Sequence, residues 1–357
     1  MSNAALLEDY LPGPKPTPVV RSGEFFFAAA HLAHSHIYGQ CQGLIEAGAQ
    51  LKSVYDPDPT KVSKFLQKFP GTHVARSFDE ILADADIKLV AAAAIPNERC
   101  ALGCRVMRAG KDYFTDKTPF TTLDQLGEAK HVVAETKRKY MVYYSERLHV
   151  ESAMHAGSLI KRGAIGRVLQ VLGLGPHRLG TNRPDWFYQR EKYGGILCDI
   201  GSHQFEQFLT YSGATDATLQ HAAVANYAHP ATPEFEDFGE ASFLGNNKAN
   251  HYVRIDWFTP DGLRTWGDGR TVILGEKGYI ELRKYIDVAR DAQGDHLYIV
   301  DGKGEHRLDL AGKVGFPFFG ELVLDCLNRT ENAMTQAHAF KAAELCLIAQ
   351  AGAKRIA

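Results

Sequence analysis

A regular alternation of apolar runs and amphipathic stretches over residues 24–145 is the feature that most constrains the fold. Runs that suit buried strands lie at 24–30, 51–55, 74–76, 87–93, 113–115 and 141–144. Stretches that suit helices lie between them, beginning near His36, Pro59, Ser77, Asn97 and Thr121. Runs that are apolar throughout, such as residues 24–30, are typical of parallel strands covered on both faces. The alternation therefore predicts an α/β domain with a parallel, doubly wound sheet.

The pattern changes after residue 145, which places a domain boundary there and a second domain at 146–357. Helices are expected at about 150–162, 195–211, 318–328 and 333–353, and strands at 219–227, 238–244, 250–257, 271–274, 279–282 and 297–300. Turn residues separate these strands, so we expect an open, mostly antiparallel sheet in an α+β domain. The C-terminal helix can pack back on the first domain. Residues 1–23, with four alternating prolines from Pro12 to Pro18, are expected to form an extended arm.

Composition excludes several classes of protein. Apolar residues make up 45% and charged residues 23%, as in globular domains. The chain of 357 residues has 40 Lys and Arg against 42 Asp and Glu, without a dense basic run, which argues against nucleic-acid binding. No window approaches the ~18 consecutive apolar residues of a membrane span. The six cysteines are scattered without a CxxC pair, so we expect reduced thiols and a cytoplasmic protein. The near-balanced charge fits an enzyme that acts on a small molecule.

The turn after the first strand is where a doubly wound sheet binds the pyrophosphate of a dinucleotide. The usual fingerprint there is G-x-G-x-x-G, whereas this chain reads His31-Leu32-Ala33-His34-Ser35-His36 and has no glycine. The three histidines suggest a metal site, but no cysteine stands nearby to complete one. We expect no metal, and the alternatives are histidines that line a cleft or face solvent.

Carboxylates and polar residues follow the later strands of the same domain. Asp56 ends the second strand, 23 residues after Ala33, where a carboxylate accepts hydrogen bonds from the ribose of NAD and repels the 2′-phosphate of NADP. Its alternative role is to cap the next helix. Ile95-Pro96-Asn97 and Asp116-Lys117 follow the fourth and fifth strands, at the sheet edge where such folds bind ligands. Lys117 can meet a substrate hydroxyl or the nicotinamide, or simply pair with Asp116.

The strongest candidate for catalysis is the run from Gly194 to His203, which reads Gly-Gly-Ile-Leu-Cys-Asp-Ile-Gly-Ser-His. Asp199 and His203 are four residues apart and share one face of a helix. A carboxylate beside an imidazole raises its basicity and fixes its orientation, which suits His203 to general acid–base catalysis. A purely structural Asp–His pair is the alternative. The two glycines would let the backbone approach a ligand closely.

These residues, in this order, resemble the Gfo/Idh/MocA family, which includes glucose–fructose oxidoreductase and inositol dehydrogenase. The resemblance covers residues 24–357 and rests on the segment His34-Ser35-His36-Ile37-Tyr38-Gly39, on Asp56, on Ile95-Pro96-Asn97, on Asp116-Lys117 and on the run that ends at His203. The family's Glu-Lys-Pro motif corresponds to Asp116-Lys117-Thr118, with Pro119 displaced by one position.

The resemblance implies an N-terminal Rossmann domain, a C-terminal domain whose sheet forms a homodimer or homotetramer, and hydride transfer between NAD(P) and a sugar or polyol hydroxyl. It implies that His203 is the acid/base, that Asp199 orients it or binds a neighbouring hydroxyl, and that Lys117 polarises the reacting oxygen. The cofactor residues carried over are His31, Ala33, His34, Asp56, Ile95, Pro96, Asn97, Asp116 and Lys117. NAD is the expected cofactor, and NADP stays open.

Three further residues just before the catalytic run are candidate substrate contacts. Arg178 and Arg183 suit an acidic group, and Trp186 can stack on a sugar ring. Salt bridges and core packing are equally good explanations for them. Two other functions also stay open. One is a relative that uses NAD without net redox change, such as a lyase or glycosidase. The other is a dinucleotide sensor without catalysis, which the absent glycines favour.

Overall fold

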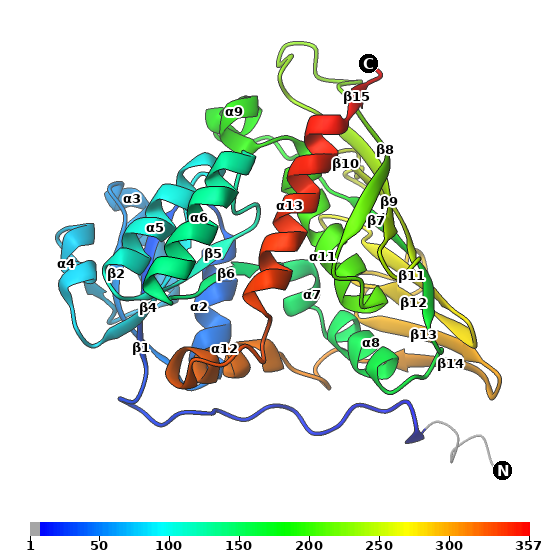
Figure 1. Ribbon diagram of the computed structural model, residues 1–357, viewed down its shortest axis with the longest axis horizontal. Coiled ribbons are helices and arrows are strands. Elements are labelled where there is room, and N and C mark those ends of the chain that lie inside the picture. The colour runs from blue at the N-terminus through cyan, green and yellow to red at the C-terminus, as the bar shows by residue number, and fades with distance from the viewer. Residues whose placement is uncertain (1–7) are drawn as a thin grey trace. The chain divides into compact units, whose positions relative to one another are not determined.

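Six parallel strands form the sheet of the first unit, in the order β3-β2-β1-β4-β5-β6 (Figure 1). Their bounds are β1 Phe26–Leu32, β2 Gln50–Tyr55, β3 His73–Val74, β4 Ile87–Ala93, β5 Asp112–Asp116 and β6 Tyr140–Tyr143. This order reverses direction between β1 and β4, as in dinucleotide-binding sheets. The predicted doubly wound fold is confirmed. The figure is drawn from a computed structural model, which describes residues 8–357.

Three helices of this unit begin at a residue whose side chain satisfies a free backbone N–H group. The helices of the unit are α2 His36–Glu46, α3 Pro59–Lys68, α4 Phe78–Ala83, the 3-10 turn η1 Pro96–Glu98, α5 Arg99–Arg108, α6 Leu123–Thr136 and α12 Pro317–Asn328. Asp58, Ser77 and Thr122 accept hydrogen bonds from the first turns of α3, α4 and α6. Helix α12 packs on α2. A Cβ at Gly43 of α2 would overlap the Phe319 ring of α12, so the close packing requires glycine at this position.

The second unit is a nine-stranded sheet with helices on one face (Figure 1). Its strands are β7 Val168–Pro176, β8 Ala217–Ala225, β9 Phe238–Gly245, β10 Asn250–Asp256, β11 Arg270–Gly275, β12 Gly278–Arg283, β13 His296–Asp301, β14 Gly304–Asp309 and β15 Lys354–Arg355. They lie in the order β14-β13-β12-β11-β7-β10-β9-β8-β15. Only β7 with β10 and β8 with β15 pair in parallel, so the predicted mostly antiparallel sheet is confirmed.

The helices of the second unit are short, apart from two that cover the sheet. They are α7 Ser145–Leu148, α8 Glu151–Lys161, the 3-10 turn η2 Asp185–Tyr188, α9 Arg190–Tyr193, α10 Ile196–Asp199 and α11 Gly201–Ser212. Helix α11 packs across β7 and β10, and α8 packs on β12 and β13. Strand β7 lies at the centre of this sheet, and we did not predict it from the sequence.

The two units do not divide the chain at a single point. The first unit comprises Pro16–Tyr144 and Phe316–Ala343, and the second comprises residues 8–15, Ser145–Gly315 and Glu344–Ala357. Residues 316–343, which the sequence assigned to the C-terminal domain, therefore lie in the first unit. The last helix, α13 Gln336–Gly352, begins in the first unit and ends in the second.

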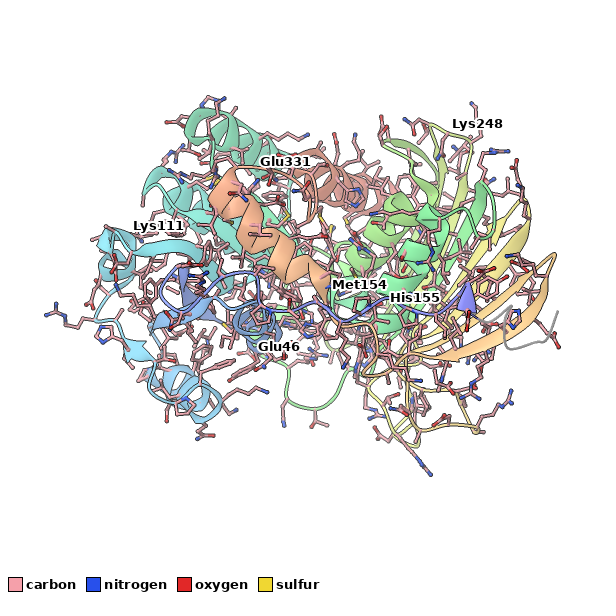
Figure 2. All side chains as sticks on the ribbon, turned by 90° about the horizontal axis from the view of Figure 1, so that it is seen from below. Glu46, Lys111, Met154, His155, Lys248 and Glu331 are labelled. Atoms are coloured by element: carbon pink, nitrogen blue, oxygen red, sulfur yellow. The ribbon has the colours of Figure 1, made fainter. Side chains whose placement is uncertain are left out.

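The N-terminal arm is predicted for residues 1–23, of which residues 1–7 lie outside the described part. Residues 11–23 contain no helix or strand, as the alternating prolines require. Within the second unit, the Tyr10 carbonyl lies 2.6 Å from His155 Nε2, and the Tyr10 hydroxyl donates to Asp301 (2.6 Å). Figure 2 labels His155, which lies on α8. These contacts hold the start of the described arm against α8 and β13.

Among residues 8–357, no helix combines the length and the apolar character that crossing a lipid bilayer demands.

Candidate active site

The turn from β1 to α2 lies at the point where the strand order of the first sheet reverses, so it is the expected place for a dinucleotide. His31 occupies the first glycine position of the fingerprint and adopts a left-handed conformation, with φ 53°. This is the conformation for which glycine is usually selected. The His31 ring packs edge-on against Phe78 and Tyr55, and burial lowers its pKa. At this position the chain therefore keeps the left-handed backbone conformation of the fingerprint, although histidine replaces the glycine.

Asp56 ties the ends of β1 and β2 together. One carboxylate oxygen accepts from the Leu32 N–H (2.5 Å), and the other accepts from the Asp58 N–H (2.8 Å). The helix cap that we considered for Asp56 is made by Asp58, which accepts from the Thr60 N–H (2.8 Å). Each oxygen of a carboxylate has a second lone pair, so Asp56 keeps the capacity to accept from a ribose hydroxyl.

Asp116 brings both loop histidines together at the end of β5. Its Oδ1 lies 2.7 Å from His36 Nδ1 and its Oδ2 lies 3.1 Å from His34 Nδ1. The carboxylate is fully buried, and although burial alone would raise its pKa, the facing His36, Arg99 and His34 hold the pKa well below its usual range. Burial and the neighbouring His36 lower the pKa of His34 to about 4. At neutral pH the His34 imidazole is therefore uncharged.

The same three side chains are spaced closely enough to hold a metal ion, since their ligand atoms lie within 4.8 Å of one another. Asp116, however, also accepts from Arg99 Nη2 (3.1 Å) and from the Lys117 N–H (2.8 Å). Four donors therefore already surround the carboxylate, one of them a buried guanidinium. We therefore interpret His34, His36 and Asp116 as a hydrogen-bonded cluster and not as a metal site.

Arg99 was missed by sequence reasoning, and it fixes the turn that carries Lys117. Its side chain is only 1% exposed, and it donates to the Ala94 carbonyl (2.7 Å) and to the carbonyls of Lys117 and Thr118. The backbone turn that the family builds with Lys-Pro is thus held here by a buried arginine. Lys117 itself is buried. The only sequence signal for Arg99 is its position two residues after Asn97.

Ile95, Pro96 and Asn97 follow β4, next to the strand reversal, as predicted. Pro96 begins the turn η1, and the Asn97 backbone carbonyl accepts from Gln125 (3.0 Å). The side-chain oxygen of Asn97 is buried and has no hydrogen-bond partner among residues 8–357. A buried acceptor of this kind indicates that a donor belongs there. The amide or hydroxyl groups of NAD would supply one, so these residues fit the cofactor.

The second unit holds Asp199 and His203 on consecutive short helices. Asp199 ends α10 and His203 lies in the first turn of α11, and both side chains are buried. The sequence placed both residues on one helix, whereas here Ile200 separates two helices. The preceding Gly194 and Gly195 have φ values of 88° and 94°, which favour glycine.

Two side chains of this unit accept hydrogen bonds from the first backbone N–H groups of α10. Glu236 accepts from the Ile196 N–H (2.8 Å), and Gln350 accepts from the Leu197 N–H (2.9 Å). A Cβ on Gly195 would overlap the Gln350 side chain. The close approach that the sequence suggested for the glycines is therefore made to Gln350. It fixes the position from which Asp199 and His203 project.

The three candidate substrate residues have different surroundings. Arg178 donates to the carbonyls of Pro260 (2.8 Å) and Leu263 (2.5 Å), which supports a structural role. Arg183 lies over the rings of Phe187 and Trp257 and feels the charge of Asp199. Trp186, on η2, is half-buried with its ring 5.8 Å from that of Phe187.

Two family models match the chain along most of its length. Residues 24–144 match the oxidoreductase family model with an NAD-binding Rossmann fold, and residues 154–281 match the C-terminal domain of the GFO/IDH/MocA proteins. The chain belongs to the Gfo/Idh/MocA oxidoreductase family. Its Rossmann unit is thus an NAD-binding domain, and the predicted membership is confirmed.

Solved structures of similar proteins have the same fold. A crystallised protein from Erwinia carotovora atroseptica SCRI1043, described as an oxidoreductase, is 53% identical, with a TM-score of 0.91 over 94% of this chain and all of that one. Levoglucosan dehydrogenase in complex with NADH is 15% identical, with a TM-score of 0.77 over 92% of this chain and 96% of that one, and shares the fold.

Curated oxidoreductases and dehydrogenases match over shorter stretches of the chain. An uncharacterised oxidoreductase of Schizosaccharomyces pombe, C115.03, is 28% identical over 42% of this chain and 41% of its own length. D-xylose dehydrogenase of Paenarthrobacter nicotinovorans is 23% identical over 40% of this chain and 38% of its own length. The match thus spans about two fifths of these relatives.

Proposed function

We propose that this chain transfers hydride between NAD and a hydroxyl-bearing carbon of a sugar, polyol or related small molecule. The observation that carries the proposal is the pair Asp199 and His203, both buried and held by a rigidly anchored helix start. Buried titratable pairs of this kind are typical of catalytic sites. The NAD-binding Rossmann unit supplies the redox partner, and related structures carry NADH or NADP.

Each residue has a role in this proposal. When bound, NAD accepts or gives the hydride. His203 takes the hydroxyl proton as the alcohol is oxidised and returns it in the reverse direction. Asp199 orients His203 or binds a neighbouring hydroxyl. Lys117 polarises the reacting oxygen, and Asp116 and Arg99 fix the backbone around Lys117.

The test is an activity panel of sugars, polyols and sugar acids with NAD and NADP, together with calorimetry of NADH binding. NADH formation with one of these substrates supports the proposal, whereas an absence of both turnover and cofactor binding rejects it. Cofactor that co-purifies and never exchanges during turnover would favour the redox-neutral alternative. Binding without turnover of any substrate would favour a sensor.

Asp56→Asn should shift cofactor preference from NAD towards NADP. The substitution keeps the size of the side chain, but it removes the charge that repels a 2′-phosphate and weakens hydrogen bonds to the ribose. Hydrogen bonds to charged groups contribute roughly 1.5–3 kcal/mol, so we expect the ratio of NAD to NADP affinity to fall about 10–100-fold. Titration with both reduced cofactors measures it. Asp58→Asn is the matched control, because Asp58 caps α3; an equal shift in both variants would refute the role of Asp56.

We also propose that the uncovered face of the second sheet forms a homodimer or homotetramer. Leu274 and Tyr279 are cross-strand neighbours on β11 and β12, and each is 42% exposed. Exposed apolar patches of this kind mark interaction surfaces. The double substitution Leu274→Lys and Tyr279→Lys should therefore produce monomers, as measured by light scattering after gel filtration. Leu327→Lys, on α12 of the other unit, should not; an unchanged oligomer in the double variant would exclude this face.

A further inference from the structure

Three side chains of the second unit form a cationic wall, defined here as Arg183, Trp257 and His177. The guanidinium carbon of Arg183 lies 4.8 Å from the Trp257 ring centre, and the His177 ring lies 5.3 Å from the same ring, nearly edge-on. Trp257 therefore joins the two nitrogen-rich side chains. Arg183 also feels the negative charge of Asp199, which relates the wall to the candidate catalytic run.

Arg183 is held rigidly and keeps one edge of its guanidinium available. It lies against both Trp257 and Phe187, two rings in edge-on contact with each other, with its guanidinium carbon 4.7 Å from the Phe187 ring centre. Its Nε donates to the Leu179 carbonyl (2.8 Å) and Nη2 reaches the Arg178 carbonyl (3.5 Å). Nη1 makes no hydrogen bond or ion pair among residues 8–357. A planar guanidinium fixed in this way is preorganised for a two-oxygen acceptor.

His177 extends the wall towards a buried carboxylate. Its Nδ1 lies 3.1 Å from the Gly175 carbonyl, and its Nε2 lies 3.4 Å from Glu146 Oε1. Glu146 is fixed in turn by Gln204 (2.8 Å) and by the buried Lys284 (3.3 Å).

The wall holds two donors without an acceptor among residues 8–357, and the first of them is Nη1 of Arg183. The buried indole N–H of Trp257 has no acceptor among the described residues. A buried excess of donors is unfavourable unless an anion or another acceptor joins them.

We propose that the cationic wall binds a carboxylate of the substrate, so that the substrate is a sugar acid or similar hydroxy acid rather than a neutral sugar or polyol. The inference rests on the proposed function and narrows it. A carboxylate fits because its two coplanar oxygens match one guanidinium edge and its negative charge pairs with the positive charge of Arg183.

The first test compares matched ligands on the NADH-saturated protein by calorimetry. The panel pairs aldonates with alditols, and uronates with aldoses, over the common stereochemistries, and includes aldose phosphates. We expect at least one carboxylate to bind about 10-fold or more tightly than its neutral partner. The proposal is overturned if no carboxylate binds, if the neutral partners bind equally well, or if phosphates bind more tightly than carboxylates.

The second test uses variants of the wall. Arg183→Gln should weaken binding of the preferred carboxylate about 10–100-fold, because a hydrogen bond to a charged group is lost. It should change binding of the neutral partner less than about threefold, since that ligand makes no ion pair. His177→Gln should act in the same direction. A merely structural role for Arg183 would weaken both ligands equally, and that result would reject the wall as a carboxylate site.

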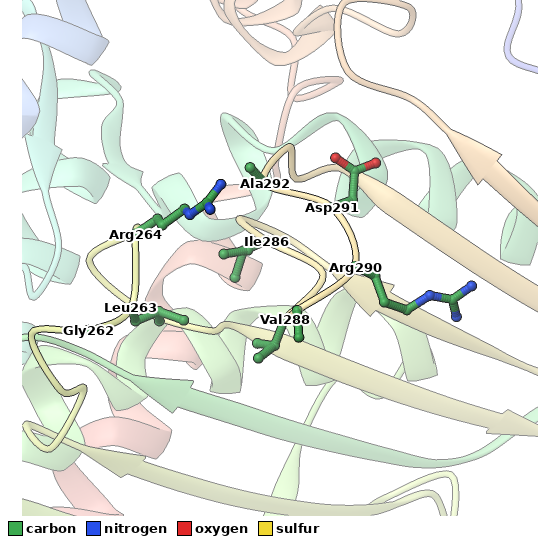
Figure 3. Close-up of a pocket in the computed structure, with 9 residues that line it drawn as sticks. Gly262, Leu263, Arg264, Ile286, Val288, Arg290, Asp291 and Ala292 are labelled. Atoms are coloured by element: carbon green, nitrogen blue, oxygen red, sulfur yellow. The ribbon is translucent and has the colours of Figure 1, made fainter.

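A matched control lies in the same unit. Arg264 and Arg290 line a cavity of about 330 Å³ between the loops 262–264 and 286–292, which is the competing place for an anion (Figure 3). Arg264→Gln should leave carboxylate binding unchanged. Weakening by Arg264→Gln but not by Arg183→Gln would move the site to this cavity and overturn the proposal. If NADH binds and only neutral substrates turn over, this inference fails while the proposed function stands; if NADH does not bind, the proposed function itself fails.

Discussion

His203→Asn should lower kcat by about 10²–10⁴-fold, the usual contribution of a general acid–base group. Asparagine has nearly the same size as the start of the imidazole side chain and can hydrogen-bond, but it cannot hold or release a proton near neutral pH. Since His203 lies in the second unit and the NAD-binding domain is residues 24–144, NADH affinity should remain the same. Steady-state kinetics with the best substrate of the panel, together with NADH titration, measures both quantities.

His221→Asn is the matched control for this variant. His221 belongs to the same unit but is exposed on β8, where it pairs with Glu240 (3.0 Å). Its replacement should leave kcat unchanged, and both variants should keep the circular dichroism spectrum of the parent protein. A fall in kcat of less than about 10-fold for His203→Asn would contradict an acid–base role, because such groups contribute at least 10²-fold.

The first unit could be predicted from the sequence because its signals are local. Strands such as β1 and β4 are apolar runs, and α3, α4 and α6 begin with a capping residue, as at Ser77, which accepts from the Glu80 N–H (3.2 Å). Asp56 was found because its position at the end of the second strand follows from the same alternation. Strand β4 has the predicted bounds, 87–93, and β1 is shifted by two residues.

Strand β7 was missed because its sequence is shaped by packing against a distant helix. It contains Gly173 and Gly175, which have low strand propensity. A Cβ at Gly173 would overlap the Gln204 side chain of α11, and one at Gly175 would lie 3.2 Å from Gln204 and from Ile200. These neighbours lie about 30 residues further along the chain, so no local pattern could reveal why glycine is required.

The Asp116 cluster was missed for a similar reason. The sequence named Asp116 apart from His34 and His36, weighed these two with His31 as a metal site, and overlooked Arg99. His36 and Asp116 are 80 residues apart and meet only because β1 and β5 end at the same edge of the sheet. A contact of this kind becomes visible only when the sheet order is known.

That cluster leads to the largest expected effect on stability. Asp116→Asn should lower the free energy of unfolding by about 3–5 kcal/mol, because removing one partner leaves the buried Arg99 guanidinium without its counter-charge. The new amide would also turn an NH₂ group towards the donors that now surround the carboxylate. Urea unfolding at neutral pH measures the change. Asp79→Asn is the control, since the exposed Asp79–Arg105 pair should contribute less than about 1 kcal/mol.

The pH dependence of this variant separates loss of charge from loss of packing. The pKa of Asp116 is held below its value of about 3.9 in an unfolded chain, so its stabilisation is present above that pH and is lost as pH falls below it. The penalty of Asp116→Asn should therefore be constant between pH 7 and 5 and shrink below about pH 4. In the double variant Arg99→Met and Asp116→Asn, the penalty should be smaller than the sum of the two single penalties, because neither charge is then left alone. A penalty that is independent of pH, with strictly additive single variants, would show that Asp116 acts through shape and not through charge.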